Sequence, residues 1–136
     1  MADRRESAVA TAAGDIERDS NAPVEALAIV EKYETALNYL YRILQNCPRK
    51  HGVARDAMLG ALLAQPELFY LAAKSSQISR LYAADANLAT LRFWLRFMSH
   101  PDRKVITPHQ RRHAEGQLAE VGRMVGAWMK TLQRKG

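Results

Sequence analysis

Apolar residues recur at steps of three or four along most of the chain, which is the period of an amphipathic helix. The first such stretch runs from Pro23 to about Asn46, and its apolar positions are Leu27, Val30, Tyr33, Leu37, Leu40 and Leu44. Proline suits the first helical position at Pro23, and Pro48 follows the last apolar residue. The pattern predicts a first helix with one buried face.

A second helix is expected from about Val53 to Lys74, with apolar residues spread widely around it. Pro66 lies inside this stretch and removes one backbone hydrogen bond. Because helix-forming residues continue on both sides, the proline predicts a bend in the helix and not a break. Ser75 or Ser76 is expected to cap the following helix, so only a tight turn separates the two.

The stretch 76–99 predicts a central helix that is apolar on almost every side. One face carries Leu81, Leu88, Leu91, Trp94, Leu95 and Met98, and the adjacent face carries Tyr82, Ala86, Ala89, Phe93 and Phe97. A helix that is apolar all round is normally buried all round, and so short a chain surrounds one only by bundling and by adding copies of itself. We therefore expect an oligomer with Tyr82, Phe93 and Phe97 at its interface.

The last helix has the clearest boundary in the sequence. Thr107, Pro108 and Gln110 combine a capping threonine, a first-turn proline and the glutamine of a capping box. The helix is expected to continue to about Gln133, with an apolar seam at Leu118, Val121, Val125, Trp128 and Leu132. The fold prediction is an all-α antiparallel four-helix bundle over residues 23–136, preceded by a polar, disordered or frayed tail over 1–22.

Length and composition narrow the class of protein. A chain of 136 residues suits one domain with a single core. No segment is long and apolar enough to span a bilayer, and the N-terminus lacks a signal-peptide pattern, so we expect a cytoplasmic protein. Cys47 is the only cysteine, which excludes an internal disulfide and favours an inert residue at a helix end.

The charge distribution predicts an anionic partner. The chain carries a formal net charge of +6, and from Arg42 onward sixteen Lys and Arg residues face six Asp and Glu residues. In an oligomer this excess is multiplied by the number of copies, which favours nucleic acid as the partner. The alternative is that the basic residues only solvate the surface.

Four basic residues of the last helix share one face. Arg112, Arg123, Lys130 and Arg134 are spaced by eleven, seven and four residues, so all four lie within about 40° of each other, opposite the apolar seam. This basic stripe is about 33 Å long, enough to follow several phosphates. The alternative is an ordinary solvated face. On the central helix, Arg92 and Arg96 lie one turn apart. They either contact nucleic acid, or one of them forms an ion pair with Asp85 across a subunit interface.

Catalytic and metal-binding patterns are weak. His109 and His113 are four residues apart, but the helical metal motif lacks its glutamate, and Arg111 and Arg112 between them oppose a cation. The sequence has no Gly-rich phosphate loop and no local signature of a nucleophilic triad. Trp94 and Trp128 are expected to fill the core and not to stack on bases. We predict no enzyme activity, no cofactor and no metal.

Three segments are distinctive: PRKHGVAR at 48–55, SQISRLYAADANLATLRFWLRFMS at 76–99, and TPHQ at 107–110 with AEVGRMVGAWMKTLQRKG at 119–136. In these segments the chain resembles the accessory variability determinant (Avd) family of diversity-generating retroelements. The resemblance extends over roughly 30–136 and leaves the first 22 residues outside it. It implies a four-helix protomer in a pentameric, basic barrel without catalytic activity.

The resemblance also implies partners and contact residues. Similar proteins bind the reverse transcriptase of the element and its template RNA, and the complex makes adenine-mutagenised cDNA that replaces a variable region in a target gene. The partner nucleic acid is therefore expected to be RNA, with DNA as the other option. Matched basic residues are candidate contacts with RNA or polymerase: Arg49, Lys50, Arg55, Arg80, Arg92, Arg96, Arg123, Arg134 and Lys135. The basic stripe adds Arg112 and Lys130.

Two rival hypotheses belong to other classes. One is a structural bundle of the kind encoded within ribosomal RNA intervening sequences, associated with RNA or ribosomes without a mutagenic role. The other is a metal-dependent bundle enzyme, which predicts metal in the purified protein. A polymerase gene and a pair of near-duplicate repeats beside this gene would favour the retroelement hypothesis over the first rival.

Overall fold

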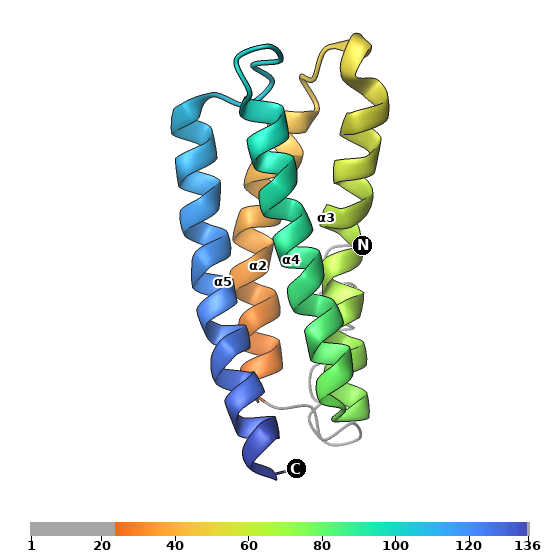
Figure 1. The fold of residues 1–136 in the computed structure, drawn as a ribbon, viewed down its shortest axis with the longest axis vertical. Coiled ribbons are helices and arrows are strands. Elements are labelled where there is room, and N and C mark those ends of the chain that lie inside the picture. Colours follow the sequence, from red (N-terminus) through yellow and green to blue (C-terminus); the bar gives the residue numbers. More distant parts are fainter. Residues whose placement is uncertain (1–23, 136) are drawn as a thin grey trace, which may run out of the picture.

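The computed structural model describes residues 24–135, which form four long α-helices and contain no β-strand in that range. The helices are α2 (Val24–Leu44), α3 (Gly52–Ser75), α4 (Ile78–Ser99) and α5 (Pro108–Lys135), and the short 3-10 helix η1 (Arg49–His51) precedes α3. Successive helices run in opposite directions and pack lengthwise (Figure 1). The all-α four-helix prediction is confirmed. The expected tail over 1–22 and the helix start at Pro23 lie outside the described residues.

Each helix buries one face in a common core. In α2 the core residues include Val30, Tyr33, Leu40 and Leu44, as the apolar period predicts, whereas Leu27 and Leu37 are only half-buried. In α5 the predicted seam is buried from Leu118 to Trp128, and Leu132 at its end is half-buried. Small residues that sequence analysis left out complete the core: Ala26, Ala36, Ala72, Ala73, Ala84 and Ala114. They let neighbouring helices approach closely.

Helix α4 buries only one of its two apolar faces. Leu81, Leu88, Leu91, Leu95 and Met98 are fully buried. On the adjacent face, the side chains of Tyr82 and Phe93 remain 48% and 47% exposed. The expected burial on all sides is therefore not met by the described part of one copy, because among its helices α4 packs closely on α3 and α5 alone.

The helix boundaries follow local chemistry. The capping box is confirmed: the backbone N–H of Gln110 donates to Thr107 Oγ1, and that of Thr107 donates to Gln110 Oε1, both at 3.0 Å. The predicted serine cap of α4 is wrong. Ser76 instead ends α3 in a left-handed conformation with φ 56°, and Gln77 precedes α4 without a side-chain cap. A two-residue turn leaves Ser76 to close one helix before the next begins.

Pro66 is accommodated inside an unbroken α3 by a residue of α2. Proline has no N–H, so the carbonyl of Leu62, four residues earlier, lacks its helical donor. The hydroxyl of Tyr33 donates a hydrogen bond of 2.5 Å to this carbonyl. Burial raises the pKa of Tyr33 well above its usual range, so the hydroxyl keeps the proton that it donates. The bond joins α2 to the point where the α3 hydrogen-bond ladder is interrupted.

About one turn along α3 from Leu62, a buried network of side-chain amides holds α3 against α4. The side chain of Gln65 is fully buried, and its Nε2 donates to the carbonyl of Ala84 at 2.9 Å. Asn87 Nδ2 donates to Gln65 Oε1 and to the carbonyl of Ala61, both at 2.8 Å. Because an unpartnered buried amide is costly, these bonds specify the register between the two helices.

Tyr33→Phe is expected to lower the free energy of unfolding by about 1–3 kcal/mol, because the Leu62 carbonyl is left buried without its donor. Chemical denaturation followed by circular dichroism measures the loss. Tyr41→Phe is the control, since Tyr41 is 44% exposed, and its change should stay within about 0.5 kcal/mol. Pro66→Ala restores an N–H to the ladder, so Tyr33→Phe should cost less in that background. Equal losses in both backgrounds would contradict this account.

Candidate nucleic-acid interface

Most of the predicted contact residues are exposed cations. Several of them are exposed and take part in none of the ion pairs found within residues 24–135. They are Arg49, Lys50, Arg80, Arg96, Arg112, Lys130, Arg134 and Lys135. Their guanidinium and ammonium groups are therefore available to an anion without breaking an internal pair. This accessibility is compatible with the predicted role, which stays a prediction for each residue.

The fold spreads these cations along the whole bundle. Arg49, Lys50 and Arg55 lie at the end where the segments 45–51 and 100–107 connect the helices. Arg80 and Lys130 lie toward the opposite end, near the start of α4 and the end of α5 (Figure 1). One copy of the chain therefore presents an extended basic surface and not a single pocket.

The basic stripe of α5 links the two ends. Arg112, Arg123, Lys130 and Arg134 are all exposed, while the seam from Leu118 to Trp128 is buried in the core. The stripe therefore faces away from the core, as the helical spacing predicts. Glu120, one turn before Arg123, forms an ion pair with it, so the acidic neighbour is already matched to a cation.

Arg92 makes a contact between helices that the sequence did not reveal. Its Nη2 donates to the carbonyl of Leu118 on α5 at 3.3 Å. Within one copy, no ion pair of the described residues joins Asp85 to Arg92 or Arg96, and both predicted roles of these arginines stay predictions. Gly122 provides the space, because a Cβ built there would lie 2.8 Å from Arg92 Nη2. Arg92 thus connects α4 to α5 and is only partly accessible, whereas Arg96 one turn later is exposed.

Two further arginines are engaged inside the protomer. Arg55 Nε forms an ion pair with Asp56 at 3.0 Å. The guanidinium of Arg103 lies 3.8 Å from the centroid of the Phe97 ring, and its Nε donates to the Phe97 carbonyl at 2.6 Å. Phe97 is half-buried and also packs against Trp94 at 5.4 Å between ring centroids. Of the three predicted interface residues, Phe97 is therefore the one with the most contacts inside its own protomer.

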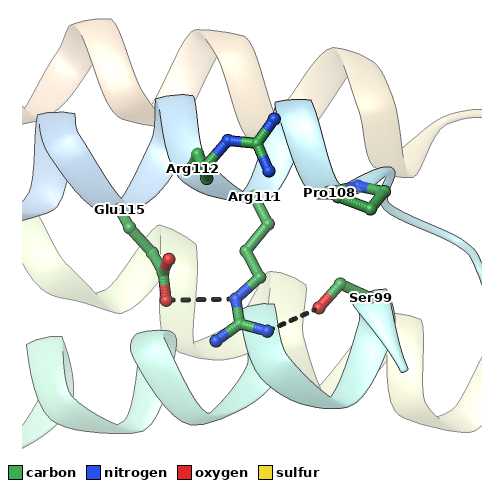
Figure 2. Close-up of a pocket in the computed structure, with 5 residues that line it drawn as sticks. All are labelled: Ser99, Pro108, Arg111, Arg112 and Glu115. Carbon is green, nitrogen blue, oxygen red and sulfur yellow. Dashed lines mark hydrogen bonds and ion pairs between the residues drawn. The ribbon is translucent and has the colours of Figure 1, made fainter. Parts of the chain in front are cut away.

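Arg111 and Arg112 are neighbours with opposite environments. Arg111 points toward α4, where it bonds Ser99 Oγ at 3.4 Å, and it pairs with Glu115 on its own helix at 3.2 Å (Figure 2). The side chain of Arg112 extends away from both partners (Figure 2). The two arginines border a hollow of about 250 Å³ with Pro108 at its edge. Arg111 is thus matched to a carboxylate, whereas Arg112 forms no ion pair with another described residue.

Arg112 also borders a second hollow, which the sequence pattern did not predict. It lies between α2 and α5, has a volume of about 470 Å³, and includes Lys32 and His113 in its lining. Just beside it the ring of Tyr39 packs on that of His113, with centroids 4.5 Å apart. Lys32 and Tyr39 are two turns apart on α2, which places them on one face. Because only the packing of α2 on α5 brings this face of α2 to Arg112, the pattern along one helix could not predict the hollow.

Cys47 and the two tryptophans pack against neighbouring parts of the protomer. Burial raises the pKa of the Cys47 thiol, with Arg55 opposing the shift, and its Sγ approaches the carbonyl oxygen of Pro48 at 3.6 Å. Trp128 is buried in the core as expected, while Trp94 is only half-buried in an aromatic cluster with Phe93 and Phe97.

Across residues 24–135, no group of three or more His, Cys, Asp or Glu side chains is placed to hold a metal ion. No helix in that range has the length and apolarity to cross a membrane.

Comparison with known proteins gives one family. Among curated proteins, no sequence matches the chain significantly. The model of the bAvd-like family matches residues 27–132, which takes in nearly all of the four helices and both connections that carry basic residues. Because this match extends over most of the chain, the chain belongs to the bAvd-like family.

Proposed function

We propose that this protein is a non-catalytic accessory factor of a diversity-generating retroelement. In this role it binds the reverse transcriptase and the template RNA and is needed for mutagenic cDNA synthesis and retrohoming. The observation that carries the proposal is membership of the bAvd-like family over residues 27–132. Sixteen Lys and Arg residues against six Asp and Glu residues from Arg42 onward suit a polyanionic partner.

The surface supports RNA binding through many weak contacts. The exposed basic stripe of α5 is about 33 Å long, so it can follow the phosphates of an RNA over several nucleotides. Arg49 and Lys50, at the end of the bundle that carries the connections, extend this surface beyond the helix. The cations not used by RNA are the candidate contacts with the polymerase.

The same proposal includes assembly of several copies, with a pentameric barrel as the form implied by the resemblance. Its support is the exposed apolar face of α4, where Tyr82 and Phe93 flank the exposed small residues Ala86 and Ala89. Large apolar side chains gathered on one exposed face are typical of an interaction surface. A ring would bring the basic surfaces of all copies together and increase the field that attracts RNA.

The test is reconstitution with the partners. The protein is co-expressed with the reverse transcriptase encoded beside it and the template RNA, and a tagged polymerase is used for pull-down and cDNA measurement. We expect the protein to co-purify and cDNA to form only when it is present. If the protein neither joins the complex nor affects cDNA, the accessory role is refuted and the structural, ribosome-associated bundle becomes the better hypothesis.

A further inference from the structure

The hollow between α2 and α5, here called the α2–α5 groove, combines cations with an exposed ring. Its lining residues are Lys32 from α2 and Arg112, His113, Gly116, Gln117 and Glu120 from α5. Gly116 forms an open part of the surface, since a Cβ built there meets no atom within 4 Å. The groove therefore offers room beside its charged groups.

Positive charge dominates the α2–α5 groove. Lys32 and Arg112 approach it from different helices, and neither forms an ion pair with another described residue. Glu120 is the acidic residue of the lining, and Arg123 on the same helix neutralises it. Two cations from different helices, neither paired with a described residue, suit a ligand with repeated negative charges, such as successive phosphates.

An aromatic pair stands beside these cations. The rings of Tyr39 and His113 are 4.5 Å apart between centroids and tilted by 53°. Tyr39 is half-buried and its ring contacts the imidazole, while His113 is exposed. An exposed ring held by a half-buried neighbour is suited to stacking with an unpaired base. Bases inside a duplex are already stacked on each other and cannot use it.

We propose that the α2–α5 groove binds a single-stranded segment of RNA. Lys32 and Arg112 hold neighbouring phosphates, and one unpaired base stacks on His113. This inference rests on the proposed RNA binding and adds where the strand lies and which form of RNA is bound. The basic stripe then continues the path of the strand from Arg112 toward Lys130 along the exposed face of α5.

The first experiment measures salt dependence. Fluorescence anisotropy with a labelled, unstructured RNA of twelve nucleotides gives affinity over a series of salt concentrations. Each phosphate contact on a single strand contributes about 0.7 to the slope of log affinity against log salt. Lys32→Gln with Arg112→Gln is therefore expected to reduce the slope by about 1.4. The control, Lys74→Gln with Lys104→Gln, removes two exposed cations outside the groove and should change the slope by less than half as much.

The second experiment separates stacking from charge. His113→Ala should weaken binding of the twelve-nucleotide strand about tenfold, because stacking of one base is lost. Binding of a blunt RNA duplex of equal length should change by less than about twofold. Equal losses on strand and duplex would overturn the stacking role, since a duplex offers no free base.

The outcomes distinguish the groove from the wider function. If the parent protein binds RNA and the groove variants behave like the control, the groove inference is refuted while RNA binding stands. If the groove variants keep RNA affinity but lose the reverse transcriptase in a pull-down, the groove is a protein contact and the inference is also refuted. If the parent protein binds no RNA, the proposed function fails and the groove inference fails with it.

Discussion

Replacing Arg123, Lys130 and Arg134 together with glutamate is expected to weaken RNA binding on the order of 100-fold. All three are exposed members of the basic stripe on α5. Losing about 1 kcal/mol for each cation–phosphate contact accounts for this factor, and the new carboxylates add repulsion. If the protein forms a ring, each copy carries the same reversal, so the field around the assembly falls as well. Fluorescence anisotropy with template RNA measures the effect.

The triple variant should remain folded. The residues opposite the stripe, from Leu118 to Trp128, supply the buried seam and are unchanged. Arg123→Glu loses the ion pair with Glu120 and places two carboxylates one turn apart, which costs a few tenths of a kcal/mol, about 0.5 at most. Arg134→Glu places a negative charge at the C-terminal end of α5, which costs about 0.3–1 kcal/mol. Circular dichroism should show unchanged helix content.

A matched control separates position from total charge. Arg42→Glu, Lys74→Glu and Lys104→Glu change the net charge by the same amount, and all three residues are exposed outside the stripe. We expect this variant to lose less than about tenfold in affinity, through the weaker general field alone. Equal losses in the two triple variants would show that the stripe has no special role and that only total charge matters.

Local patterns predicted the helices because their ends are determined by nearby residues. The reciprocal hydrogen bonds of Thr107 and Gln110 involve residues three apart, so the start of α5 is visible in the sequence. Pro48 similarly marks the end of the first helical region. The prediction of a serine cap was wrong because either neighbouring helix can use a serine in so short a turn. Ser76 closes α3 in the left-handed conformation, and Ser75 Oγ accepts a hydrogen bond from the backbone N–H of Gln77.

The contacts that sequence analysis missed join residues far apart along the chain. Tyr33 bonds the Leu62 carbonyl 29 residues away, and Arg92 bonds the Leu118 carbonyl 26 residues away. Neither partner is marked by residue type, because each acceptor is a backbone carbonyl that any residue would supply. The α2–α5 groove has the same origin, since Lys32 and Arg112 meet only when the two helices pack.

The charged side chains show which properties of a residue helical spacing can predict. For the stripe of α5, the helical wheel predicted the exposed side correctly because the buried seam on the same helix fixes its rotation. For Arg92 the wheel did not show the contact of the guanidinium, because the long side chain reaches the Leu118 carbonyl of a neighbouring helix over Gly122. A pattern on one helix therefore predicts which side a residue is on, and only the packed structure shows what its end contacts.

The second large effect is expected at the exposed face of α4. Tyr82→Ser with Phe93→Ser should convert an oligomer to single copies. The two rings are 48% and 47% exposed, so each has about 100 Å² left to bury, worth about 2–3 kcal/mol. Losing both weakens each contact between copies by about 5 kcal/mol, a factor of several thousand in affinity. Light scattering after size-exclusion chromatography should then report a mass near 15.3 kDa.

Contacts within one copy decide which aromatic residue of α4 is kept. Phe97 is left unchanged because its ring carries Arg103, so its loss would disturb the protomer as well as any interface. Tyr41→Ser is the control, since Tyr41 on α2 is 44% exposed, and the oligomer should survive that change. Thermal unfolding should show that the α4 variant is still folded. A parent mass near one copy, or an α4 variant that keeps the parent's multiple, would refute assembly through this face and leave Tyr82 and Phe93 as candidate contacts for the polymerase.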